Sequence, residues 1–122
     1  MQILVVDDLQ TDRFIIKKIL QPDFGVMTLS SATEARAYAR SHSFEVALIN
    51  VMLRNDLDGI ELLHDLRRLN PHHFEAIAIT CHVDDSRHGQ LLRSGFKSVM
   101  KKPFDRMQFE TLVGRHSRPE AA

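Results

Sequence analysis

The chain has 122 residues, of which 43% are apolar and 26% charged, so it has the size and composition of one globular domain and not of a disordered chain. Its 16 Lys and Arg side chains balance its 16 Asp and Glu side chains, which excludes the one-signed field of a general nucleic-acid or membrane binder. The single cysteine, Cys81, excludes a disulfide within the chain, and no apolar run approaches the roughly 20 residues of a membrane span. We therefore expect a soluble, cytoplasmic domain.

Apolar runs and segments of helical period alternate along the chain. The first half predicts a strand at 3–6, a helix at 11–20, a strand at 26–29, a helix from the Ser31–Glu34 capping box to about Ser41, and a strand at 44–49. The second half predicts a helix that opens at Asp58-Gly59 and stops before Pro71, a strand at 76–79, a helix at 84–94, a strand at 98–101, and a last helix from Asp105. Strict alternation with short joints predicts an α/β fold in which helices cover both faces of a parallel sheet.

Polar residues mark the ends of these strands. In a sheet of this kind, ligands collect beyond the carboxyl ends of the strands. The polar residues expected there are Asp7, Asp8, Asn50, Thr80 and Lys102. Two carboxylates, an amide, a hydroxyl and an ammonium at one edge could hold a hard cation together with a phosphate-like anion. The sequence therefore predicts a small charged pocket at this edge of the sheet.

The blocks that carry these residues resemble the receiver domain of bacterial response regulators. They are Ile3–Asp8, Phe44–Leu53, Asp58–Leu62, Ile79-Thr80 and Lys101–Phe104. The resemblance implies a flavodoxin-like, doubly wound (βα)5 three-layer sandwich with strand order 2-1-3-4-5, in which Asp7, Asp8 and position 50 are neighbours. It covers residues 1–117, and residues 118–122 are expected to be a tail or the start of a linker.

The resemblance also implies that position 50 is the phospho-acceptor, where the family has an aspartate that takes a phosphoryl group from a histidine kinase. Asp7 and Asp8, with the carbonyl oxygen of Met52, would hold the magnesium ion that this transfer needs. This chain has Asn50 instead, and an amide neither attacks phosphorus nor forms an acyl phosphate. The amide also removes an anionic metal ligand, so we expect magnesium binding to be weak or absent.

Three further positions correspond to the switch of the family. The resemblance implies that Thr80 bonds the phosphoryl oxygens and that Lys102 pairs with the phosphorylated aspartate, the bond to Pro103 being typically cis. The aromatic side chain that turns inward on activation is replaced by Val99, and a valine has no comparable change of rotamer. The switch is therefore expected to lack both its acceptor and its aromatic reporter.

These departures predict a pseudo-receiver and not an enzyme: a signalling module of a two-component phosphorelay that acts through protein–protein contacts. Its expected partners are a histidine kinase, a phosphotransfer protein or an effector, docked on the fourth helix, fifth strand and fifth helix; a homodimer is left open. We expect no membrane contact and, since the chain has no helix-turn-helix, no nucleic-acid binding. Lys102 then needs a counter-charge, which we expect from Asp7 or Asp8.

A conventional, magnesium-dependent receiver is the alternative. It would accept the phosphoryl group on Asp56 or Asp58, or would carry an engineered Asp-to-Asn change at position 50. Asp58 is also explained as the cap of the following helix, and Asp56 as a solvated loop residue. A flavodoxin-type cofactor site is disfavoured, because the turn at 7–11 has two acids and no glycine to cradle a phosphate. The basic residues within 97–118 are either a solvated face or a docking patch for an acidic partner.

Overall fold

The computed structural model describes residues 1–52 and 59–113, and this part of the chain contains five strands and five helices in strict alternation. The strands are β1 (Gln2–Val6), β2 (Gly25–Leu29), β3 (Val46–Asn50), β4 (Glu75–Thr80) and β5 (Ser98–Lys101). The helices are α1 (Gln10–Leu20), α2 (Ala32–Ala39), α3 (Gly59–Leu69), α4 (Asp85–Arg93) and α5 (Arg106–Val113). Asp56, Asp58 and the expected tail at 118–122 lie outside the described residues.

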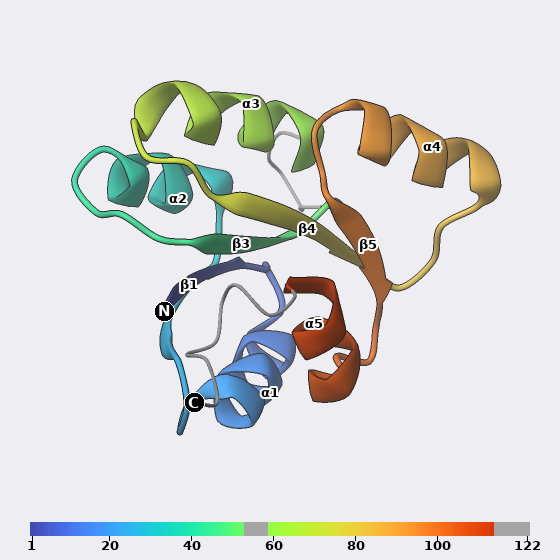
Figure 1. Cartoon of the computed structure of the whole chain (residues 1–122), viewed down its shortest axis with the longest axis horizontal. Coiled ribbons are helices and arrows are strands. Elements are labelled where there is room, and N and C mark those ends of the chain that lie inside the picture. The colour runs from blue at the N-terminus through green and yellow to red at the C-terminus, as the bar shows by residue number, and fades with distance from the viewer. Residues whose placement is uncertain (53–58, 114–122) are drawn as a thin grey trace, which may run out of the picture.

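The strands form one parallel sheet in the order β2-β1-β3-β4-β5. Helices α1 and α5 cover one face of the sheet, and α2, α3 and α4 cover the other, which gives three layers (Figure 1). The expected doubly wound, flavodoxin-like α/β fold with strand order 2-1-3-4-5 is therefore confirmed. Within residues 1–52 and 59–113, each helix is too short or too polar to cross a membrane.

Burial on both faces of the sheet explains why the strands read as continuous apolar runs. Along β1, Leu4 and Val6 belong to the core cluster beneath α2, α3 and α4, whereas Ile3 and Val5 belong to the cluster beneath α1 and α5. All four side chains are completely buried. Because successive side chains of a strand point to opposite faces, a strand covered on both sides must be apolar at every position. Polar side chains can enter only where a strand leaves the core.

The element boundaries differ from the expected ones by one or two residues. The apolar pattern predicts the third strand from Phe44, but β3 begins two residues later, because Phe44 packs from the preceding loop onto Phe74, with ring centroids 4.8 Å apart. Asp84 is the N-cap of α4, so that helix begins one residue later than expected. The Ser31 cap is confirmed, since its hydroxyl accepts from the backbone N–H of Glu34.

Gly59 begins α3 where the backbone of Val51 passes close by. A Cβ on residue 59 would lie 2.8 Å from the Cα of Val51 and 2.9 Å from its Cγ1, which is closer than non-bonded carbon atoms approach. The variant Gly59→Ala must therefore displace the end of β3 or the start of α3. We expect it to lower the free energy of unfolding, measured by urea denaturation, by about 1–3 kcal/mol.

Gly89→Ala in α4 is the matched control. A Cβ there would meet the guanidinium of Arg93 at 3.1 Å, and a long side chain can move away. Because alanine is a better helix former than glycine, this variant should raise the free energy of unfolding by about 0.5–1 kcal/mol. Equal effects of Gly59→Ala and Gly89→Ala would contradict the close-approach constraint at Val51.

Candidate functional site

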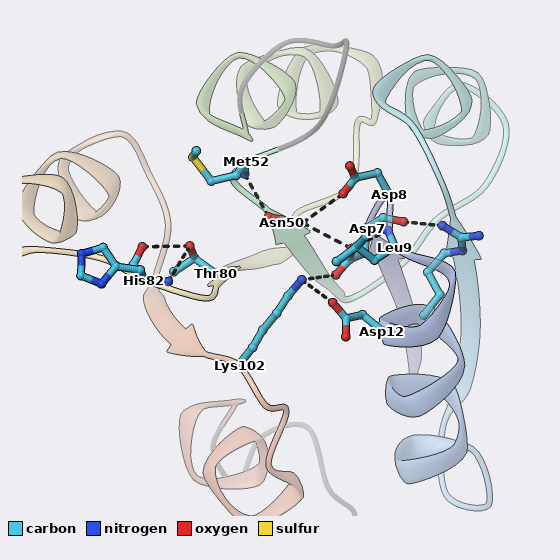
Figure 2. Close-up of polar contacts among 10 residues, drawn as sticks. Asp7, Asp8, Leu9, Asp12, Asn50, Met52, Thr80, His82 and Lys102 are labelled. Carbon is cyan, nitrogen blue, oxygen red and sulfur yellow. Dashed lines mark hydrogen bonds and ion pairs between the residues drawn. The ribbon is translucent and has the colours of Figure 1, made fainter.

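The carboxyl ends of the strands carry the polar residues singled out in the sequence. The register pairs Val6 with Ile49 and Asn50 with Ile79, so the residues that end or follow β1, β3 and β4 are held at one edge of the sheet. The structure brings together there all five expected residues, Asp7, Asp8, Asn50, Thr80 and Lys102 (Figure 2). A cleft of about 550 Å³ opens at this edge, and its walls are formed by Asp8, Leu9, Asn50, Met52, Thr80, Cys81, His82 and Lys102.

Asn50 is the last residue of β3 and is 5% exposed. Its Nδ2 donates to Oδ1 of Asp7 and to Oδ1 of Asp8, each at 3.3 Å, and its Oδ1 accepts from the backbone N–H of Met52 at 2.9 Å (Figure 2). Both polar atoms of the amide therefore have partners. A carboxylate at the same place would set three negative charges together, and a nearby cation would be needed to keep them all ionised. The amide fills the position without adding a charge.

Lys102 follows β5 and reaches across the pocket to acids on the far side. Its Nζ lies 3.0 Å from Oδ2 of Asp7 and 2.6 Å from Oδ2 of Asp12 (Figure 2). The side chain of Asp7 is fully buried, and that of Lys102 is 12% exposed. Burial acts to lower the pKa of Lys102, but the hydrogen bonds and charges of Asp12 and Asp7 outweigh it and hold the pKa above its ordinary value. The peptide bond between Lys102 and Pro103 is cis, as the resemblance implies.

The sequence alone does not place Asp12 in this pocket. The sequence predicts the counter-charge of Lys102 from Asp7 or Asp8. Asp7 is a partner, and the second partner is Asp12, 90 positions away from Lys102. Asp12 lies in the first turn of α1, where an acid is ordinary because it interacts favourably with the helix dipole. The signal that could have revealed it is its place one helical turn after the acidic pair, on the helix that starts at this edge.

The two remaining switch positions lie in different surroundings. Thr80 is buried, and its hydroxyl donates to the backbone oxygen of His82 at 3.1 Å and accepts from the N–H of His82 at 3.4 Å. The hydroxyl is thus engaged by the loop that follows β4 (Figure 2). Val99 is half-buried in β5, packs against the core cluster beneath α2, α3 and α4, and does not line the cleft.

A magnesium ion needs several hard oxygen donors around one point. Asp7 and Asp8 supply carboxylate oxygens that fit this requirement, but Asn50 turns its NH₂ group toward them and its oxygen toward Met52. The carboxylates of Asp7 and Asp8 therefore fit a magnesium site, to which Asn50 turns no oxygen. Within the described ranges 1–52 and 59–113, no three His, Cys, Asp or Glu side chains converge in a way that could hold a metal ion.

Comparison with known proteins identifies the family. The family model described as the response regulator receiver domain matches residues 3–114. The chain belongs to this family. Among solved structures, this receiver domain is similar to a response regulator receiver domain protein from Methanospirillum hungatei, with 25% sequence identity, coverage of 92% of this chain and 89% of that chain, and a TM-score of 0.81.

Two curated relatives of this receiver domain are longer proteins. The regulatory protein VanRc of Enterococcus gallinarum is 30% identical over 108 residues, which cover 88% of this chain and 46% of VanRc. A response regulator receiver protein of Anaeromyxobacter sp. (strain Fw109-5) is 36% identical over 102 residues, which cover 82% of this chain and 42% of the relative. The chain thus spans less than half the length of these two relatives.

The ion pairs of Lys102 make a prediction about stability. Lys102→Met should lower the free energy of unfolding by about 3 kcal/mol, because it leaves the buried carboxylate of Asp7 without its counter-charge. Since the pKa of Lys102 is raised above 10.5 in the folded chain, this stabilisation is fully present below pH 10.5 and is lost as the pH rises through the folded pKa. The difference in unfolding free energy between the native chain and Lys102→Met should therefore shrink only at high pH.

Urea denaturation between about pH 7 and about pH 11 measures this difference. Lys101→Met, at the exposed neighbouring position, is the control and should change the unfolding free energy by less than about 0.5 kcal/mol at every pH. A difference for Lys102→Met that widened above pH 10.5 would contradict the raised pKa.

Proposed function

We propose that this receiver domain is a pseudo-receiver: a signalling module of a two-component phosphorelay that is not phosphorylated at position 50 and acts through protein–protein contacts. The observation that carries the proposal is the hydrogen bonding of Asn50, whose amide donates to Asp7 and Asp8 and accepts from Met52. An amide does not attack phosphorus and cannot form an acyl phosphate. The residue at the acceptor position thus completes the pocket as a neutral group.

Magnesium has a reduced role in this proposal. When bound in a receiver, the ion neutralises the carboxylates around the phosphoryl group, and here Asp7 and Asp8 would hold it together with the carbonyl oxygen of Met52. Two groups of the chain already contact the same carboxylates. Asn50 donates a hydrogen bond to each acid, and Nζ of Lys102 lies 3.0 Å from Oδ2 of Asp7. Binding of the ion is therefore weak or absent at physiological concentrations.

The switch positions support a domain that stays in one state. The hydroxyl of Thr80 is engaged by His82, and no acyl phosphate forms that would draw it inward. Val99 packs against the core and offers no aromatic ring to reorient. Without a covalent trigger, the conformational equilibrium shifts only if a partner binds one conformation better than the other.

The proposed partners are a histidine kinase, a phosphotransfer protein or an effector that docks on the α4-β5-α5 face. Exposed apolar side chains support a docking surface, among them Met107 of α5 at 78% exposure and Leu92 of α4 at 40%. We place the module, residues 1–117 with a tail or linker at 118–122, in the cytoplasm. Neither a membrane nor nucleic acid is among the proposed partners, and a homodimer would use the same face.

Chemical phosphorylation tests the central statement. Incubation of the native chain with acetyl phosphate and magnesium should leave its intact mass unchanged, because residue 50 carries no attacking oxygen. Asn50→Asp, which restores that oxygen, is the matched control and should gain one phosphoryl group under the same conditions. A stable gain of one phosphoryl group on the native chain would overturn the proposal in favour of a receiver that accepts on Asp56 or Asp58.

Asn50→Asp also tests the role of the amide in stability. The variant loses the hydrogen bonds to Asp7 and Asp8 and adds a further carboxylate beside them, so without magnesium its Tm should fall by about 5–10 °C. Millimolar magnesium should raise the Tm of the variant much more than that of the native chain, since the ion offsets the added charge. Equal magnesium-induced shifts in the two chains, measured by circular dichroism, would show that the amide does not weaken the metal site.

A further inference from the structure

The position of Lys102 is set by a carboxylate from helix α1. The resemblance implies that this lysine pairs with the acceptor aspartate at the end of β3, but Asn50 directs its amide to the acidic pair and to Met52. Asp12 accepts a hydrogen bond from Lys102 at 2.6 Å, which is shorter than the 3.0 Å contact with Asp7 (Figure 2). The acid that engages the lysine most closely therefore belongs to a different element of the fold.

We propose that Asp12 takes the place of the acceptor carboxylate as the fixed partner of Lys102, and that this contact holds the turn from β5 into α5 in one position without phosphorylation. Asp12 is thus a positioning residue. The inference rests on the proposed function, since a carboxylate at position 50 would compete with Asp12 for the same ammonium group.

The number of charged groups in the pocket supports the replacement of the acceptor carboxylate by Asp12. With Asp12, the pocket holds three carboxylates and one ammonium group, the same balance as a receiver with an aspartate at position 50 and no metal ion. Lys102 is 12% exposed, and a charge so little hydrated needs close counter-charges. A neutral Asn50 would leave it with Asp7 alone, and Asp12 restores the missing negative charge at hydrogen-bond distance.

A second contact links the C-terminal end of α1 to the start of α5. Arg106, the first residue of α5, donates from Nη1 to the backbone oxygen of Ile19 at 3.0 Å and from Nη2 to Asp23. Helix α1 is therefore joined to the β5–α5 region twice, by Asp12 in its first turn and by Ile19 in its last turn. The buried side chains of Phe109 and Val113 already pack α5 into the core, and two polar contacts at opposite ends of α1 oppose any remaining tilt of the β5–α5 region.

The backbone at Lys102 is held as well. Its N–H donates to the oxygen of Thr80 at 2.8 Å, and the hydroxyl of Thr80 is bonded within its own loop. A displacement of the backbone at Lys102 would break this bond and pull Nζ away from Asp7 and Asp12. The turn into α5 should therefore present a partner with one fixed arrangement.

A double-mutant cycle tests whether Asp12 acts through Lys102. Asp12→Asn, Lys102→Met and the double variant are compared by their unfolding equilibrium constants in the native Asn50 chain. We expect the two substitutions to be coupled by about tenfold or more. If Asp12 only stabilised the helix dipole, Asp12→Asn would cost the same with and without Lys102.

The pair Asp65 and Arg68 in α3 is the control cycle. Asp65 is 25% exposed, close to the 26% of Asp12, but Arg68 is 68% exposed, so we expect a coupling of about twofold. A coupling between Asp12 and Lys102 no larger than that of the control pair would overturn the proposal.

Amide hydrogen exchange tests the positional effect and does not require Lys102→Met to fold. Asp12→Asn should speed exchange of the backbone amides of residues 101, 102 and 104–106 by about fivefold or more, while Asp65→Asn should leave them unchanged. Unchanged exchange there in Asp12→Asn would overturn the proposal. Both measurements use neither phosphoryl donor nor magnesium, so phosphorylation of the native chain would refute the proposed function without altering the outcome for Asp12.

Discussion

The buried charge of Asp7 is the constraint around which the pocket is arranged. Its side chain is fully shielded from solvent at the end of a strand that is covered on both faces. Such a carboxylate persists only if it is paired and hydrogen-bonded. Leu9 N–H and the Asn50 amide donate to its Oδ1, and Lys102 lies beside its Oδ2. The segments that follow β1 and β5 and the last residue of β3 therefore all contact one carboxylate.

The amide at position 50 is well suited to this constraint. An aspartate at position 50 would add a fourth carboxylate to Asp7, Asp8 and Asp12, and the single ammonium group of Lys102 would leave an excess of negative charge. Asn50 relieves part of that excess with hydrogen bonds and keeps the geometry of the neighbouring acids. The acids of the pocket thus receive hydrogen bonds and an ion pair from groups of the chain itself.

The fold and much of the pocket follow from local pattern, and the missed parts follow from contacts that no pattern encodes. Runs such as residues 3–6 and 76–79 must be strands covered on both faces, and polar residues at their ends must meet at one edge. Phe44 looks like a strand residue because burial, not β-structure, makes it apolar. Asp12 looks like an ordinary helix-start acid, since its contact with Lys102 depends on how α1 packs against the far edge of the pocket.

The double attachment of α1 to the β5–α5 region also affects how partners influence one another. Helices α1 and α5 lie on the same side of the sheet (Figure 1), and the contacts of Asp12 with Lys102 and of Ile19 with Arg106 link α1 to the turn before α5 and to the first residue of α5. A protein that binds the exposed Phe14 and displaces α1 would, through these contacts, also displace the start of α5. If a ligand of α1 changed the affinity of α5 for its own ligand by some factor, the α5 ligand would change the affinity of α1 for its ligand by that same factor. Binding at the two helices would then be coupled.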